Sequence, residues 1–276
     1  MGLPTLSFAL EGNTRIIATG GVHQVEGAAG GGLVPWAVIA GYGQSGEFGF
    51  SGFSSAVEVD DYTYTSGGFA LSFSDRIELS FARQSLDISE LSQLAGLADD
   101  KLTTDVIGLK VRLFNNLIYD PWPQISLGVQ HKKVKDFDVP QIAGALDDSD
   151  TDVYLSATKL WLNGVAGYPI LVNATFRSTS ANQLGLLGFG GDLNDDKEIQ
   201  IETSAAILFR RNLAVGFEYR QKPDNLSFAE EEAWSDIFVA WFPSKNISVT
   251  AAVVDLGTIG LFEKQNGFYL SIQGAL

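Results

Sequence analysis

Hydrophobic and polar residues alternate with a period of two along most of this sequence, and segments with helical periodicity are nearly absent. In one segment, Ile199 and Ile201 alternate with Glu198, Gln200 and Glu202. Successive side chains of a β-strand point to opposite faces, so the pattern predicts strands with one apolar and one polar face. The same alternation recurs in residues 106–113, 124–130, 170–177, 198–209, 213–222, 247–253 and 268–273.

Strand length and charge favour lipid as the environment of the apolar faces. The predicted strands run about 10 to 12 residues, which suits a tilted bilayer crossing and exceeds the usual length of globular strands. Fixed charges occur in the middle of the polar faces, although charged residues make up only 18% of the chain. A soluble β-sandwich is the alternative, but its exposed surface would carry more charge. We therefore predict an all-β fold, a transmembrane antiparallel up-and-down β-barrel.

The connections between these strands predict an orientation. Short turns alternate with long polar segments near residues 88–103, 137–151, 180–196, 222–234 and 256–267. Nearly every short turn is flanked by aromatic residues, as in the interfacial girdle of outer-membrane barrels. We therefore expect the short turns on the periplasmic side and the long loops outside. The predicted girdle consists of Phe73, Phe114, Trp122, Trp161, Tyr168, Phe209 and Trp241.

The number of strands depends on the beginning of the chain. Thirteen segments can be counted back from the C-terminus to Trp36. Because a single-chain barrel of this type has an even number of strands, residues 12–22 are the candidate for a fourteenth. We favour fourteen strands, and twelve if the N-terminal segment folds inside the lumen. The whole chain, 1–276, is predicted to be one domain, with residues 1–33 as the N-terminal segment and 34–276 as the barrel meander.

The glycine-rich stretch from Gly27 to Gly32 leaves two interpretations open. It forms either a plug against the inner wall, with Gly27, Gly30, Gly31 and Gly32 giving close approach, or a flexible turn leading into a strand at residues 36–42. A phosphate-binding loop is disfavoured because no GxGxxG or P-loop lysine is present.

Composition narrows the function further. The 276-residue chain has 18 Lys and Arg against 33 Asp and Glu, a net charge of −15, which argues against nucleic-acid binding. The absence of cysteine excludes a disulfide scaffold, a thiolate metal site and a cysteine nucleophile. We expect no cofactor. The start, Met1-Gly2-Leu3-Pro4, lacks signal-peptide features, and with the strand pattern this indicates a mature chain whose signal peptide was replaced by an initiator methionine.

Charged residues on the polar strand faces are the candidate functional residues. They form either the constriction of a diffusion pore or a self-neutralising network that packs a closed interior. In an eight-stranded barrel, side chains fill the interior. This barrel should be wider, which favours the pore. The predicted lumen-lining residues are Glu78, Lys110, Arg112, Arg177, Glu202, Glu218 and Arg220.

Neither histidine supports an enzymatic site. His131 is in phase with outward-facing apolar residues, and His23 has Glu26 nearby but no serine or aspartate linked to it by spacing. The acidic run at residues 147–152 has the alternate spacing that Ca²⁺ accepts, but lacks the glycine and closing glutamate of an EF-hand. The simpler interpretation is that these acidic residues are solvated on an outer loop. The functional interpretation is that they bind divalent ions shared with lipopolysaccharide.

Several phrases resemble a family of uncharacterised Gram-negative proteins, domain of unknown function 3034. The resemblance implies an outer-membrane β-barrel and supplies no catalytic residues. The chain departs from the usual aromatic C-terminal residue of such barrels by ending in Leu276. The phrases are TGGVHQVEGAAGGGL at residues 19–33, DVIGLKVR at 105–112, ANQ and LLGFGGD within 181–192, EYRQKPDNL at 218–226 and AWFPSKN at 240–246.

These observations predict a passive or substrate-selective porin-like channel for small solutes in the outer membrane of a Gram-negative bacterium, not an enzyme. Its expected partners are outer-membrane lipid, lipopolysaccharide, a small-molecule solute and, during biogenesis, the barrel-assembly machinery. The alternative is a closed structural or interaction barrel with acidic outer loops and no transport.

Overall fold

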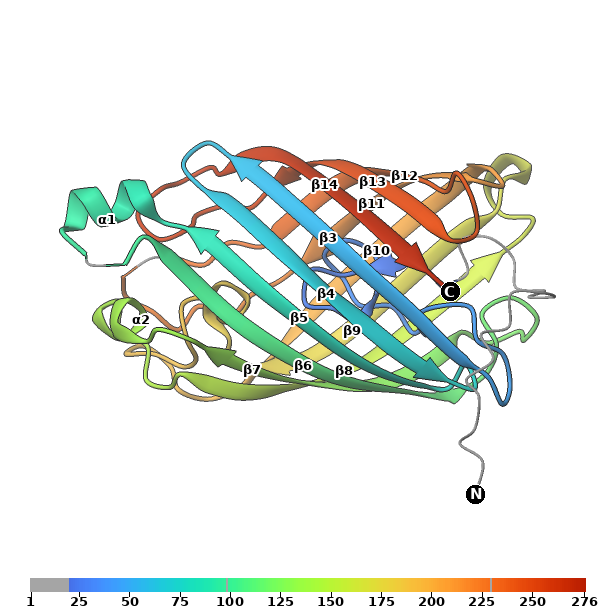
Figure 1. Cartoon of the computed structure of the whole chain (residues 1–276), viewed down its shortest axis with the longest axis horizontal. Coiled ribbons are helices and arrows are strands. Elements are labelled where there is room, and N and C mark those ends of the chain that lie inside the picture. The colour runs from blue at the N-terminus through green and yellow to red at the C-terminus, as the bar shows by residue number, and fades with distance from the viewer. Residues whose placement is uncertain (1–19, 98, 229) are drawn as a thin grey trace, which may run out of the picture.

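The computed structural model describes residues 20–97, 99–228 and 230–276, and its main element is a closed β-barrel (Figure 1). Every strand pairs antiparallel with its neighbours in the chain, and the first barrel strand pairs with the last to close the barrel. The twelve strands are β3 (Phe48–Val59), β4 (Thr63–Phe73), β5 (Ile77–Asp87), β6 (Lys101–Phe114), β7 (Gln124–Val134), β8 (Ser149–Trp161), β9 (Ile170–Thr179), β10 (Glu198–Arg210), β11 (Leu213–Arg220), β12 (Trp234–Trp241), β13 (Ile247–Asp255) and β14 (Asn266–Ala275).

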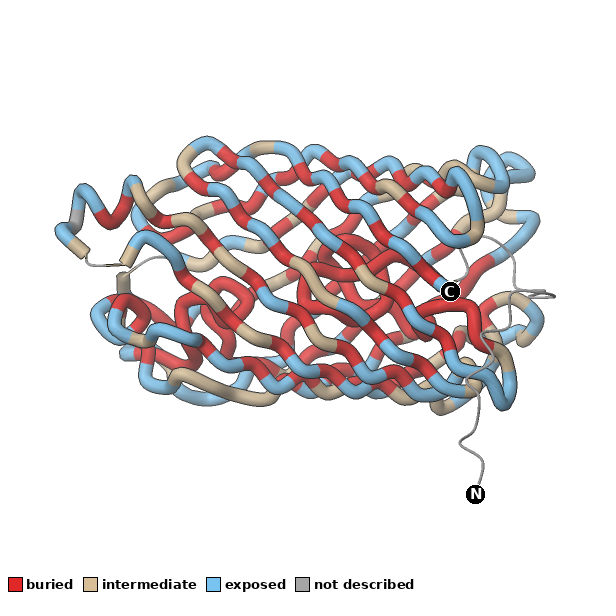
Figure 2. Tube along the Cα trace, in the orientation of Figure 1, coloured by how far each residue is buried: buried red, intermediate tan, exposed pale blue. Residues whose placement is uncertain are grey.

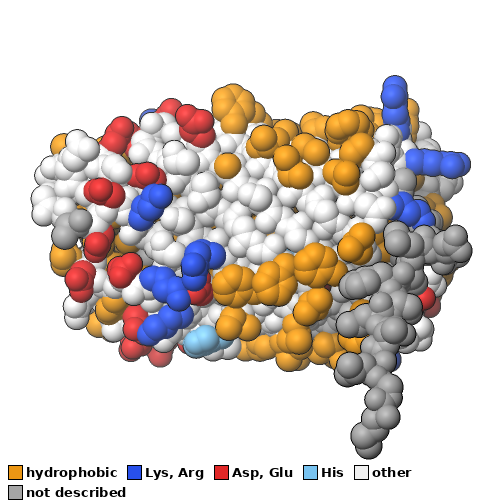
Figure 3. Space-filling view, viewed as in Figure 1, with side chains coloured by type: hydrophobic (Ala, Val, Ile, Leu, Met, Phe, Trp, Pro, Cys, Tyr) orange, Lys and Arg blue, Asp and Glu red, His pale blue; other side chains and the backbone are white. Residues whose placement is uncertain are grey.

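Burial alternates along these strands with the period read from the sequence. In β3 the pattern is buried at every second residue, and Figure 2 shows the same alternation over the whole barrel wall. The buried positions face inward and carry many polar side chains, whereas the exposed ones carry Phe, Leu, Ile and Val. Figure 3 shows this apolar surface as a band, with charged side chains gathered beyond it at one end. The wall is thus apolar outside and largely polar inside.

The two ends of the barrel differ in their connections. One end, called the short-turn end below, has tight turns such as that at Ser74 and Asp75, where both residues have positive φ (56° and 49°), as a type I′ turn requires. The other, the long-loop end, carries the helices α1 (Ser89–Ala95) and α2 (Asp138–Ile142) and the 3₁₀ turn η2 (Asn182–Gly185) (Figure 1). A second 3₁₀ turn, η1 (Val165–Gly167), lies at the short-turn end. No helix among the described residues is long and apolar enough to cross a membrane.

The favoured count of fourteen strands is wrong: the barrel has twelve. Residues 36–42, expected to be a strand, form none, and all seven are buried. A barrel strand alternates between a buried and an exposed face, so a fully buried run cannot be part of the wall. The expected strand at residues 12–22 lies largely outside the described residues. The barrel proper therefore begins at Phe48, not near residue 34.

Residues 20–43, called the inner segment below, lie within the barrel (Figure 1). The inner segment contains a small two-stranded sheet, β1 (Val22–His23) paired with β2 (Ala29–Gly30). Its backbone reverses around residues 24–28, where the Gln24 amide donates to the Ala28 carbonyl at 2.9 Å. It rejoins the wall at the short-turn end, where the Tyr42 amide donates to the Leu276 carbonyl at 3.3 Å.

Candidate functional site

Polar contacts hold the inner segment to the wall, alongside the apolar packing of residues such as Leu33, Trp36 and Val38. The Glu78 carboxylate accepts from the backbone amides of Ala29 at 3.1 Å and Ala40 at 2.7 Å, and so ties together two parts of the segment. The Glu218 carboxylate accepts from the Leu33 amide at 2.8 Å. Inward side chains of the strands thus satisfy backbone groups that the segment would otherwise bury unpaired.

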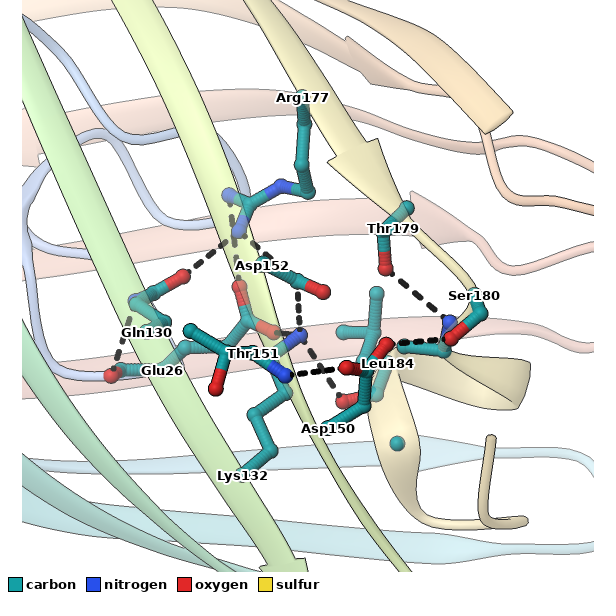
Figure 4. A network of polar contacts seen from close by, with 12 residues as sticks. Glu26, Gln130, Lys132, Asp150, Thr151, Asp152, Arg177, Thr179, Ser180 and Leu184 are labelled. Atoms are coloured by element: carbon teal, nitrogen blue, oxygen red, sulfur yellow. Dashed lines mark hydrogen bonds and ion pairs between the residues drawn. The ribbon is translucent and has the colours of Figure 1, made fainter. Parts of the chain in front are cut away.

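The inner segment places one carboxylate among three wall cations, two of which, Lys132 and Arg177, are labelled in Figure 4. Glu26 pairs with Lys132 through Oε1, with Arg220 through Oε2 at 2.8 Å, and with Arg177 through Oε2 at 3.6 Å. The three cations come from β7, β11 and β9, and all four side chains are at most 2% exposed. Glu26 therefore ends in a fully desolvated cationic pocket.

Two wall carboxylates complete this cluster. Asp152 on β8 accepts from Lys132 at 2.7 Å and from Arg177 at 3.2 Å. Glu202 on β10 pairs with Arg177 and lies 3.4 Å from Arg220 Nε. The cluster therefore balances three cations with three carboxylates, of which one belongs to the inner segment.

Neutral groups orient the same guanidinium. Arg177 donates to Gln130 Oε1 at 2.6 Å, and its guanidinium lies over the Tyr154 ring, 4.9 Å from the ring centroid. A guanidinium bound in its plane and stacked on its face has little freedom to turn. The wall side of the pocket is therefore preorganised.

A second buried pair lies against the inner segment. Lys110 is 3.2 Å from Glu78 Oε1 and donates to the carbonyl oxygens of Ala29 at 2.8 Å and Trp36 at 3.3 Å. Glu78 and Lys110 occupy facing positions on β5 and β6. This pair thus binds both amides and carbonyls of the segment.

The structure brings six of the seven predicted lumen residues to the inner segment or the cluster around Glu26, and leaves one apart. Arg112 pairs with Asp75 at 2.7 Å at the short-turn end, with both side chains about one-fifth exposed (21% and 18%). It also lies beside a bulge at the end of β6. Arg112 therefore belongs to the rim of the barrel and not to the buried cluster.

Sequence reasoning missed Glu26, Lys132 and Asp152 as members of the cluster. The alternation predicts that Lys132 faces inward, because its neighbour His131 faces outward. His131 is indeed exposed, and its ring bonds Thr151 at 3.0 Å. Glu26 carried no such signal, since the inner segment has no strand periodicity.

The glycines of the inner segment allow close approach to the wall. A Cβ placed on Gly31 would lie 1.9 Å from Glu218 Oε1, and one on Gly27, whose φ is +95°, would lie 3.1 Å from the Ala82 Cβ. On Gly30 it would meet the Val34 carbonyl at 2.3 Å, whereas on Gly32 the nearest atom is 3.4 Å away. Three of the four glycines therefore permit contacts that a side chain would prevent.

A cavity of about 600 Å³ lies between the inner segment and the wall, toward the short-turn end. Its lining is mainly apolar and includes Trp36, Leu171 and Phe238, with Arg210 and Arg211 among the lining residues. At the long-loop end the barrel is covered by an apolar cluster that includes Ile88 and Leu187. Trp36, Leu171 and Phe238 belong to the same cluster, so apolar packing extends to both ends of the barrel interior.

The model of the family described as "Protein of unknown function (DUF3034)" matches residues 19–273. The chain belongs to this family. No curated protein matches it in sequence. Among solved structures, the KdgM porin is similar at 10% identity and a TM-score of 0.52, over 81% of this chain and 98% of that one. The NanC porin is similar at 7% identity and a TM-score of 0.50, over 82% and 98%. These likenesses show a shared fold, the closed barrel of outer-membrane porins.

In this member of the family, the predicted girdle aromatics point away from the lumen. All seven are at least 40% exposed, and they lie near the short turns. Tyr168 and Phe209 pack together with their ring centroids 5.4 Å apart, next to the start of β9 and the end of β10. The structure places them as an outward ring at the short-turn end.

His23 and the acidic run both have structural partners. The His23 ring bonds Ser51 at 2.7 Å and the Gly27 carbonyl at 2.8 Å, and stacks on Phe53. In the acidic run, hydrogen bonds from Lys133 and Ser149 hold the pKa of Asp148 below its ordinary value.

Cations pair with the other acids of the run instead of leaving them grouped. Asp150 pairs with Lys197 at 2.8 Å, and Asp152 points into the cluster around Glu26. Among the described residues, no group of three or more His, Asp or Glu could hold a metal ion.

Proposed function

We propose that this protein is an outer-membrane channel for small solutes whose lumen is closed by the inner segment. The single observation that carries the proposal is that a piece of chain, not the wall's own side chains, fills the barrel. A twelve-stranded barrel is wider than the eight-stranded kind that side chains alone can fill. Without the inner segment, its middle would be lined by inward polar residues such as Gln84, Gln124, Ser126, Gln130, Thr158, Asn173 and Thr175.

The outer surface supports a membrane location. Leu79, Leu109, Phe176 and Ile201 are all at least 40% exposed and lie within the barrel strands. Contiguous apolar surface of this kind is unfavourable in water and suits a bilayer. With the porin-like fold, it supports the outer membrane of a Gram-negative bacterium, with the long acidic loops toward lipopolysaccharide.

The nature of the internal contacts favours a removable plug over a permanently closed barrel. A core that never opens is stabilised at least as well by apolar packing, because buried ion pairs lose much of their attraction to desolvation. Here the closing contacts of Glu26 are ionic, and the neighbouring backbone contacts are hydrogen bonds that water could replace. Such contacts suit a segment that leaves its site.

Planar-bilayer recordings of the wild type and of Glu26→Gln test the proposal. Removing one partner from a buried ionic cluster costs about 3 kcal/mol or more, so the open state should gain roughly a hundredfold in population. We expect rare openings in the wild type and frequent stable conductance steps in Glu26→Gln. Glu90→Gln, on the exposed surface of α1, is the matched control and should behave as wild type.

Two results would contradict the proposal. Silence of every variant, with circular dichroism showing a folded barrel, would support the closed structural barrel. A wild type that conducts permanently, with the same open probability as Glu26→Gln, would show that the inner segment does not close the lumen.

A further inference from the structure

Resting on the channel function proposed above, we infer that Lys132, Arg177 and Arg220 form a binding site for the carboxylate of a permeating solute. Glu26 occupies this site when the channel is closed. The solute class that follows is small organic acids. A solute carboxylate and Glu26 then exclude each other, so the solute favours release of the inner segment.

The first support is the way in which Glu26 is bound. Its two carboxylate oxygens are divided between different cations, with Oε1 to Lys132 and Oε2 to Arg220 and Arg177. Gln24, a residue of the same segment, adds one donor to Oε2 at 2.5 Å. The wall therefore recognises the carboxylate group itself, which any carboxylic acid presents in the same form.

The second support is the charge of the wall without the segment. Among the residues that the structure describes, the three cations then keep Asp152 and Glu202 as their carboxylate partners, which leaves one positive charge in excess. A buried charge without a counter-ion is strongly unfavourable, so the vacated site should attract an anion. One added carboxylate restores the balance of three positive and three negative charges.

The third support is that the site is shaped before the ligand arrives. Arg177 is fixed by Glu202, by Gln130 and by the Tyr154 ring, none of which belongs to the inner segment. Lys132 is likewise held by Asp152 on the neighbouring strand. These cations can keep their positions after Glu26 leaves, and preorganised groups bind a ligand with a smaller entropic cost.

Chemical rescue in detergent micelles tests the site without any conductance. Glu26→Ala should melt at a lower temperature than the wild type, and sodium acetate should raise its melting temperature progressively with concentration. Acetamide, which has the same shape without the charge, and sodium chloride at equal ionic strength should have smaller effects. Glu90→Ala is the control variant, in which acetate should act no differently from chloride.

A second measurement covers the case in which Glu26→Ala does not fold. Ala37 lies on the inner segment and is fully buried, and the chain has no cysteine, so Ala37→Cys introduces a single thiol. Acetate should accelerate its labelling by a water-soluble maleimide, and acetamide should not.

Acetate indistinguishable from chloride in both measurements would overturn the inference. Because neither measurement depends on ion flow, a silent channel with acetate rescue would refute only the channel function. A conducting channel without rescue would refute only the carboxylate site.

Discussion

Single residues decide how closely the inner segment can approach the wall. Gly31 and Gly32 are neighbours in the chain, yet a Cβ on Gly31 would lie 1.9 Å from the Glu218 carboxylate, whereas one on Gly32 would lie at an ordinary 3.5 Å from it. That carboxylate is already fixed, since it accepts from the Leu33 amide and from the Ser204 hydroxyl, both at 2.8 Å. Replacing Gly31 would therefore disturb a buried charge that has little room to move.

Gly31→Ala should lower the melting temperature of the protein in detergent and increase its conductance in bilayers. The methyl group would lie 1.9 Å from Glu218 Oε1, and overpacking of this kind costs about 1 to 3 kcal/mol. Gly32→Ala is the matched control, because its methyl group meets the Tyr269 ring at an ordinary 3.4 Å. Equal effects of the two substitutions would show that the contact with Glu218 does not determine the seating of the segment.

At the scale of the elements, the strands could be predicted from the sequence, whereas the sequence left the glycine-rich stretch open between a plug and a turn. Alternation such as that of Ile201 and Glu202 follows from a wall with lipid on one side and the lumen on the other. Residues 36–42 have no such asymmetry, because the barrel surrounds them on every side, and they therefore looked like one more apolar strand. The length of the chain alone could not distinguish twelve strands from fourteen.

The charged cluster was predictable only in part, for a related reason. Arg177, Glu202 and Arg220 lie on strands, and their inward direction follows from their phase. Glu26 joins them from a segment whose path depends on contacts with residues far away in the sequence, such as Arg220 and Lys132. No local pattern encodes such contacts.

The outer loops contain a contact whose strength should depend on pH. Asp192, in the loop after β9, accepts from the Ser227 hydroxyl and from its backbone amide at 2.9 Å, and so joins two loops. These hydrogen bonds from Ser227 lower the pKa of Asp192. The stabilisation is fully present above the ordinary pKa of aspartate and is lost as the pH falls through the lowered value.

Hydrogen exchange of the peptides around residues 186–193 and 224–228 should therefore accelerate on acidification below the ordinary aspartate pKa, after correction for the intrinsic pH dependence. In Asp192→Asn this extra acceleration should disappear. Asp195→Asn, in the same loop, should retain it. Acid sensitivity that persists in Asp192→Asn would mean that another group controls the docking of these loops.

At the scale of the whole molecule, charge is distributed unevenly between the mouth and the lumen. The connections at the long-loop end contain seventeen Asp and Glu against four Lys and Arg, and thus carry most of the net charge of −15. The cluster around Glu26 is neutral while the inner segment is seated, and carries one positive charge in excess without Glu26. In the proposed channel, an entering anion would thus meet repulsion first and attraction afterwards.

The charges at the mouth and those of the buried cluster should respond differently to salt. Ion selectivity measured at several salt concentrations therefore tests this distribution. The mouth charges are exposed to solvent and are screened within about 10 Å at 0.1 M salt, whereas the buried cluster is screened much less. In open Glu26→Gln channels, the anion-to-cation permeability ratio from reversal potentials should therefore rise as the salt concentration increases. Neutralising the exposed acids Asp60, Glu230 and Glu263 to Asn or Gln in the same background should raise the ratio at low salt and flatten its salt dependence. A ratio that falls with salt would instead place the dominant selectivity in exposed positive charges, and the buried cations would then have no part in choosing the ion.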